Sequence, residues 1–318
     1  MSFRENAQSH HSRCRAFNFL TPRQRYHINK LCSAKQLYEA HVRTKLIREL
    51  AGFYLLACAW SWGWWIIGMN HFSTRSIMSP EFVSILWAGS FGPTVGAIGG
   101  AWIAGGYHQV RVLLQTIFSF RTGWRTYTVI LFGFPLVFFI GYLALGITPV
   151  AGAFLMAITL VIAAPINGLA TALMGPGPLG EELGWRGYAL PRLLSFLSPA
   201  RASLVVGVAW AIWHAPLIVF PDWRNDVSIG WFMLIYPLSI IALSFAFTAV
   251  HMQSNGSVGL AIIFHGVINF TAGAASNSQL WEFDSYSNLG RFTLVVGFMG
   301  VAAAAIWFLL FSNRPNKM

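Results

Sequence analysis

Two adjacent glutamates and an arginine, Glu181, Glu182 and Arg186, stand between segments apolar enough to cross a membrane. An ionised side chain at membrane depth costs roughly a few kcal/mol or more, so it marks a candidate functional site. In a helix, Glu182 and Arg186 lie four residues apart in the favourable acid-before-base order, whereas Glu181 points about 100° away. We expect Arg186 to neutralise Glu182 and Glu181 to stay free for chemistry. The alternative is a solvated, acid-rich helix start.

Two histidines and an asparagine follow in later apolar segments. His214 comes four residues after Trp210 and just before Pro216, which distorts a helix. His265 and Asn269 are also four residues apart and share one helix face. Singly, these groups are equally typical of hydrogen bonds inside a bundle. Together with Glu181 they can hydrolyse a peptide bond: the carboxylate takes a proton from water, the imidazoles orient that water or bind a metal, and the amide donates to an oxyanion.

The order and spacing of these motifs resemble the CAAX protease and bacteriocin-processing (CPBP, or Abi) family of intramembrane endopeptidases. The motifs are Glu181-Glu182-x-x-x-Arg186, an aromatic residue four positions before His214, and His265-x-x-x-Asn269. The resemblance covers roughly residues 50 to 312. One departure is Trp210, where the family usually has Phe, and we expect it to change packing rather than chemistry.

The resemblance implies catalytic roles for five residues. Glu181 would activate the attacking water, and Glu182 would support the site through its ion pair with the arginine. His214 would join Glu181 at the water or a metal. His265 and Asn269 would stabilise the tetrahedral oxyanion or complete a ligand set.

A zinc ion is also implied, although the metal requirement of the family is disputed. Its ligands would be Glu181, His214 and His265, which can form a first shell only if their three segments converge. The sequence has no H-E-x-x-H helix of the kind found in common zinc proteases. Cys14, Cys32 and Cys58 have no C-x-x-C spacing, so they predict neither a thiolate zinc site nor a disulfide framework.

The elements that must position these residues are membrane-spanning helices. The 318 residues are 56% hydrophobic and only 10% charged, where a soluble domain carries about 25% charge. We expect an all-α, polytopic bundle of about eight spans, with the motif helix at about 178–196 as a partial element, around an intramembrane catalytic cavity. An amphipathic helix between Gly106 and Arg125 should lie on the membrane surface. The expected spans are 52–69, 82–105, 126–146, 152–174, 202–220, 230–251, 257–274 and 292–312.

The distribution of basic residues predicts the orientation. With the N-terminus in the cytoplasm, 18 Lys and Arg fall on the cytoplasmic side and 3 on the other. This count favours a protein of the plasma (inner) membrane with both termini in the cytoplasm and a cavity open to the cytoplasm. The net charge of +11 does not indicate nucleic acid, because 10 of the 21 basic residues precede residue 50 with few aromatic partners. A basic arm beside anionic lipid explains them better.

We therefore expect a basic, partly disordered cytoplasmic arm at 1–50, a protease domain at 51–312 and a cytoplasmic tail at 313–318. The partners would be the lipid bilayer and a membrane-associated or lipidated substrate, either a prenylated CAAX tail or a bacteriocin leader peptide. A proton- or ion-coupled transporter is one alternative, since broken helices and intramembrane His and Glu also mark ion paths, although no second broken helix or repeated half is visible. An inactive family member acting in immunity or as a scaffold is another.

Overall fold

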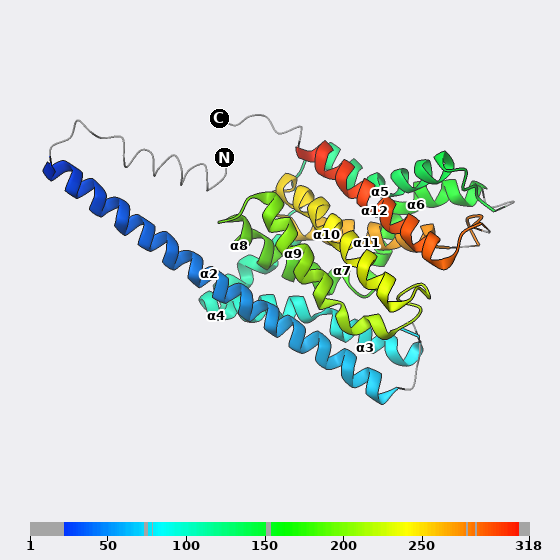
Figure 1. Cartoon of the computed structure of the whole chain (residues 1–318), viewed down its shortest axis with the longest axis horizontal. Coiled ribbons are helices and arrows are strands. Elements are labelled where there is room, and N and C mark those ends of the chain that lie inside the picture. The colour runs from blue at the N-terminus through cyan, green and yellow to red at the C-terminus, as the bar shows by residue number, and fades with distance from the viewer. Residues whose placement is uncertain are drawn as a thin grey trace.

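The computed structural model describes residues 22–72, 76–77, 79–150, 154–277, 279–283 and 285–311. In these ranges the regular structure is helical, apart from an isolated bridge between Pro149 and Trp281. The expected all-α architecture is confirmed (Figure 1). In chain order the elements are α2 (Pro22–His71), α3 (Pro80–Ser90), α4 (Gly92–Gln115), the 3-10 turn η1 (Thr116–Phe118), α5 (Trp124–Ala144), α6 (Phe154–Met174), α7 (Pro178–Glu182), the π-helical turn η2 (Leu183–Ala189), α8 (Leu190–Leu194), α9 (Pro199–Trp213), the 3-10 turn η3 (Ala215–Val219), α10 (Ile229–Gln253), α11 (Val258–Ala275) and α12 (Asn288–Phe311).

Among the described residues, six helical segments are long and apolar enough to cross a membrane, where the sequence predicted about eight for the whole chain. At the expected span 152–174, α6 runs over Phe154–Met174 as predicted, and Val161–Met174 is its fully described apolar part. At 202–220 the apolar helix, Pro199–Trp213, is shorter than predicted. This helix stops early because the chain passes through His214 into η3, which begins just before Pro216. The six segments are Gln36–His71, Pro80–Phe118, Trp124–Ala144, Ile229–Gln253, Val258–Ala275 and Asn288–Phe311.

The first helix, α2, is longer than a membrane span. It runs from Pro22 to His71, so it joins the second half of the predicted arm at 1–50 to the apolar run expected at 52–69. Its N-terminal half extends beyond the helices that its C-terminal half contacts (Figure 1). Residues 1–21 and 312–318 lie outside the described residues, and with them the start of the predicted arm and the whole predicted tail.

Two breaks divide the second expected span. Phe91 separates α3 from α4, and α4 itself is kinked where Gly105 and Gly106 leave helical geometry. Gly106 has φ of 62°, a left-handed conformation that glycine adopts without steric cost. The amphipathic helix expected after Gly106 is therefore present as a separately directed segment, which ends at η1.

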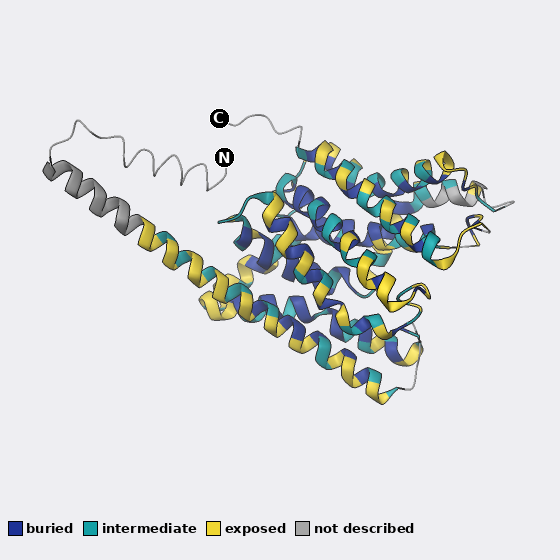
Figure 2. Ribbon diagram, in the orientation of Figure 1, coloured by how far each residue is buried: buried dark blue, intermediate teal, exposed yellow. Residues whose placement is uncertain are grey.

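The centre of the bundle is α11, which packs against α6, α5 and α10. Buried positions gather around it and around α7 (Figure 2). Gly266 lets α6 approach closely, since a Cβ there would stand 2.1 Å from the carbonyl oxygen of Gly168. The helix that carries His265 and Asn269 is thus enclosed largely by protein.

Side-chain bonds identify the two ends of the bundle. At one end, which we call the basic end, Arg192 Nε donates to Glu49 Oε2 and Thr122 Oγ1 donates to the carbonyl of Gln253. At the other, the far end, Ile77 N donates to the Asp222 carboxylate. Because α10 and α12 run parallel, with Phe232 beside Phe292 near their starts, both helices begin at the far end. The position of the site is described relative to these two ends.

Candidate active site

The segment that carries the glutamates begins at a sharp break after α6. The chain leaves α6 at Met174, and Gly177, with φ of 111°, turns it into α7, where Pro178 occupies the first turn. Glu181 N donates to the carbonyl of Gly177 at 2.8 Å, which closes the first turn of α7. The helix then widens into η2 instead of continuing as the regular α-helix expected over 178–196. This wider turn lies directly after the two glutamates, and such π-helical turns occur frequently at functional sites.

Glu182 binds two cationic or potentially cationic partners through one oxygen. Its Oε1 accepts from Arg186 Nη1 at 2.9 Å and from His265 Nδ1 at 2.7 Å. The Arg186 guanidinium also lies over the rings of Trp210, at 4.3 Å, and Phe247, at 3.7 Å. Glu182 and Arg186 have no exposed side-chain surface, so this carboxylate is part of the packed interior.

Glu181 is oriented differently. Its Oε2 accepts a hydrogen bond from the indole Nε1 of Trp210 at 2.5 Å. Its Oε1 lies on the side of Gly177, where a Cβ added to the glycine would stand 2.9 Å from Oε1 and 3.8 Å from both Asn269 Nδ2 and His265 Cε1. One oxygen of Glu181 is thus held by Trp210, and the other shares a small space with the amide of Asn269 and the ring of His265.

His214 comes from a third segment, at the end of α9. Its Nδ1 lies 2.9 Å from the carbonyl oxygen of Trp210, and because a carbonyl oxygen can only accept, Nδ1 carries the proton. The neutral ring then keeps the lone pair of Nε2 for another partner. Trp223 stacks on the imidazole at 5.8 Å, and Tyr236 meets it edge-on at 5.8 Å. Backbone and aromatic contacts together fix the ring.

A cavity of about 500 Å³ joins these groups. Glu181, His214, His265 and Asn269 all line it, although they come from α7, the end of α9 and α11. Glu182 and Arg186 stand behind this wall rather than in it. The structure therefore brings together four of the predicted catalytic residues at one cavity and places the fifth, Glu182, in contact with His265.

The cavity also reaches towards the far end of the bundle, where Ile77, Asp222 and Asn225 contribute to its wall. The charge count assigns this end to the side opposite the cytoplasm. The predicted orientation therefore places this part of the cavity on the side opposite the predicted cytoplasmic opening.

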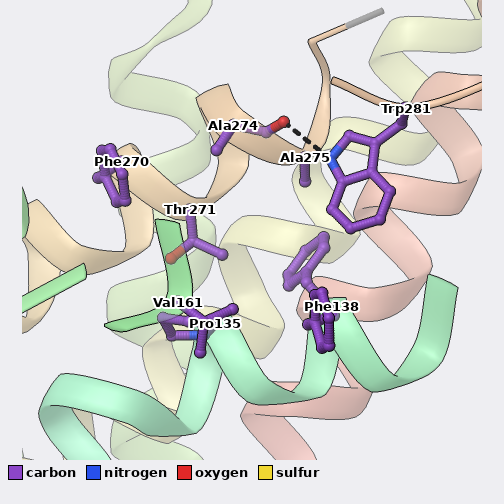
Figure 3. Close-up of a pocket in the computed structure, with 9 residues that line it drawn as sticks. Pro135, Phe138, Val161, Phe270, Thr271, Ala274, Ala275 and Trp281 are labelled. Atoms are coloured by element: carbon purple, nitrogen blue, oxygen red, sulfur yellow. Dashed lines mark hydrogen bonds between the residues drawn. The ribbon is translucent and has the colours of Figure 1, made fainter. Parts of the chain in front are cut away.

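A second cavity lies elsewhere in the bundle, among α5, α6 and α11 (Figure 3). It measures about 30 Å³, and no Asp, Glu, His, Lys, Arg or Cys is among the residues that line it. Trp281 contributes to its wall and donates from its indole Nε1 to the carbonyl of Ala274 at 3.2 Å. This cavity offers no group for acid-base chemistry.

The predicted zinc ligands, Glu181, His214 and His265, are not gathered into one ligand set. Among the described residues, no group of three or more His, Cys, Asp and Glu is arranged to hold a metal ion. Nδ1 of His265 is bonded to Glu182 and Nδ1 of His214 to a backbone carbonyl, bonds that metal-ligating histidines also make, so Nε2 of each ring would be the ligand atom. As arranged, the three side chains do not fit a three-ligand site, and zinc stays a prediction.

Three aromatic residues at the site were not predicted to contribute to it. Trp223 and Tyr236 contact His214, and no local pattern in the sequence signals this. Trp210 was expected to alter packing only, yet its indole N–H binds Glu181. Its position four residues before His214 was the available signal, because that spacing places both residues on one helix face.

Comparisons with known proteins agree with the motifs. Residues 164–271, which contain every predicted site residue, match the family model described as type II CAAX prenyl endopeptidase Rce1-like. CAAX prenyl protease 2 of Methanococcus maripaludis is 42% identical over 93 residues, which make up 28% of this chain and 34% of that protein. The match thus spans about a third of the length of the curated relative. The resemblance to the CAAX protease family, inferred from the three motifs, is therefore confirmed, and residues 164–271 carry it.

Proposed function

We propose that this protein is an intramembrane endopeptidase that hydrolyses a peptide bond of a membrane-associated substrate with a water activated by Glu181. The observation that carries the proposal is the single cavity lined by Glu181, His214, His265 and Asn269. An unpaired carboxylate, two imidazoles and an amide donor facing one space are the parts that peptide hydrolysis needs. The family match supports a peptidase and does not favour the transporter alternative.

The proposed reaction begins with a water molecule between Glu181 Oε1 and the imidazole of His214. Glu181 accepts a proton from the water while the water oxygen bonds to the carbonyl carbon of the substrate. The oxyanion that forms accepts a hydrogen bond from the amide of Asn269, with His265 beside it. When the C–N bond breaks, the proton held by Glu181 passes to the leaving nitrogen, which releases an amine and a carboxylic acid.

Glu182 has a supporting role in this proposal. Its negative charge is compensated by Arg186 and it holds His265 by Nδ1, so it fixes the ring of a residue that lines the cavity. Two carboxylates that are adjacent in sequence thus receive different tasks because their surroundings differ. One faces the cavity, and the other is sealed behind it.

The proposed substrate is a lipidated peptide, with a prenylated CAAX tail as the first candidate and a bacteriocin leader peptide as the second. Apolar residues from α10 and α12 form much of the cavity wall and are suited to an isoprenoid chain; they include Phe232, Ile240, Leu243, Phe292, Val295 and Met299. The Methanococcus relative is named a CAAX prenyl protease, which supports the same choice. We place the protein in the plasma (inner) membrane with both termini in the cytoplasm, from the basic residue count.

The test is hydrolysis in H₂¹⁸O by the purified protein in liposomes. A farnesylated CAAX peptide, the same peptide without the lipid, and a leader peptide would be incubated with wild-type protein and with Glu181→Gln. The proposal expects a new C-terminus carrying one ¹⁸O with wild-type protein and almost none with the variant. Comparing membrane-peptide termini in cells that carry either protein extends the test to native substrates. If neither experiment finds a cleavage that depends on the wild-type protein, the proposal is wrong.

A further inference from the structure

The indole of Trp210 contacts the candidate base directly. Its Nε1–H donates to Glu181 Oε2 at 2.5 Å, and the donor is buried with 2% of its surface exposed. We propose that Trp210 is a positioning residue for the endopeptidase reaction: it holds the carboxylate of Glu181 through one oxygen so that the other oxygen faces the attacking water. This inference rests on the proposed function and adds a residue to it.

Trp210 determines which oxygen of the Glu181 carboxylate is free. A carboxylate has two equivalent oxygens, and rotation about its last bond exchanges them unless one is held. The bond from Trp210 engages Oε2, while Oε1 faces the space shared with Asn269 Nδ2 and His265 Cε1. A hydrogen bond to an ionised acceptor is stronger than a neutral one, so this contact can maintain the orientation.

The indole of Trp210 is itself held on several sides. Its ring lies 4.3 Å from the Arg186 guanidinium and meets Phe247 edge-on at 5.7 Å and His265 at 5.6 Å. A donor that is itself fixed transmits its position to its acceptor. Trp210 is therefore part of the same packed interior as the buried ion pair of Glu182 and Arg186.

Trp210 also connects two of the proposed catalytic groups. The side chain of Trp210 binds Glu181, and its backbone carbonyl accepts from His214 Nδ1 at 2.9 Å. Glu181 and His214 are 33 residues apart in sequence, but each is oriented by an atom of the same tryptophan. The spacing of the reacting groups thus depends on the placement of Trp210.

Phenylalanine at this position would keep most of the ring contacts and lose the N–H donor. The substitution Trp210→Phe therefore separates the polar role from the packing role. We expect kcat to fall by about ten- to a hundredfold, as for loss of a hydrogen bond to a charged group, with KM for the peptide unchanged. The melting temperature should change little.

A double-mutant cycle tests whether Trp210 acts through Glu181. In a Glu181→Gln background, Trp210→Phe should cause no further loss of single-turnover rate, because the group that it positions is already disabled. The matched control is Trp281→Phe, which also removes a buried indole donor but lies at the second cavity (Figure 3). That control should keep the wild-type kcat.

A readout without catalysis completes the test. In protein labelled with ¹⁵N-tryptophan, the indole N–H resonance that disappears in Trp210→Phe should shift in Glu181→Gln and stay in place in Glu282→Gln. An unchanged kcat in Trp210→Phe, a full additional loss in the Glu181→Gln background, or a resonance unaffected by Glu181→Gln would overturn the role of Trp210 alone. Wild-type protein that cleaves no peptide would overturn the proposed function, and the role with it, even if the resonance shifts.

Discussion

Arg186 Nη1 and Glu182 Oε1 are 2.9 Å apart in an ion pair with no exposed side-chain surface. A buried charge depends on its partner far more than a surface charge does, because water cannot replace the lost contact. Glu182 retains only His265 when the arginine is removed. The pair is therefore a point at which stability and activity are linked.

Arg186→Ala should destabilise the bundle by about 3 kcal/mol, the order found when one member of a buried pair is removed. Expression and melting temperature in detergent should fall together with activity. Lys45→Ala is the control, since Lys45 lies 4.0 Å from Glu49 with 66% of its side chain exposed, and such surface pairs contribute about 1 kcal/mol or less. A stable, correctly inserted but inactive Arg186→Ala would point instead to a direct catalytic role.

Glu181→Gln should lower turnover by about two to four powers of ten, the range for loss of a general base, without loss of thermal stability. The amide keeps the shape of the side chain and removes the proton acceptor. Glu282→Gln, on an exposed side chain bonded to Thr148, should leave turnover unchanged. Near-normal turnover in Glu181→Gln beside a folded, inactive Glu182→Gln would show that the two carboxylates have exchanged roles. If Glu181→Gln, Glu182→Gln and His214→Ala all kept a measured peptidase activity, the protease proposal would have to be abandoned.

Gly177→Ala should abolish most activity for two reasons. Its φ of 111° is strained for any residue with a Cβ, and that Cβ would stand 2.9 Å from Glu181 Oε1. Gly146→Ala shares the first problem and lacks the second, since Gly146 has φ of 71° and no heavy atom within 4 Å of its added Cβ. Both variants should lose about 1–3 kcal/mol of stability, and only Gly177→Ala should lose kcat. Equal activity in the two variants would remove Gly177 from the site.

The orientation can be measured with single cysteines in a protein whose three native cysteines are replaced by serine. Arg121→Cys lies beside the basic end and Ser285→Cys in the connection between α11 and α12, and both positions are exposed. With both termini in the cytoplasm, an impermeant thiol reagent added to intact cells should label Ser285→Cys and spare Arg121→Cys until the cells are opened. The reverse pattern would contradict the charge count and place the far end of the bundle in the cytoplasm.

The apolar runs predicted most helices because span length is encoded locally. The sequence also predicted that Glu182 and Arg186 would face each other, since this inference needs only neighbours along one segment. The span expected at 202–220 was overestimated because hydropathy does not register that the helix ends at Trp213, shortly before Pro216.

The sequence did not predict the hydrogen bonds between residues on different helices. The bond from His265 to Glu182 joins residues 83 positions apart, and the bond from Trp210 to Glu181 joins residues 29 apart. Each depends on how far one helix is rotated and shifted against another, which periodicity within either helix does not specify. For the same reason the sequence could nominate Trp210 as a neighbour of His214 and could not assign it a polar partner.

The π-helical turn Leu183–Ala189 holds its residues through backbone bonds that reach one residue further than those of an α-helix. It therefore accommodates a residue that an α-helical path would leave out. Deletion of Gly187 would let the turn relax into an α-helix and would leave the residues after it near their present rotation about the helix axis, because the wider turn already absorbs the extra residue. What such a deletion would move is Arg186 inside the turn, beside Glu182, so the extra residue serves the ion pair of the site rather than the packing of the helix that follows.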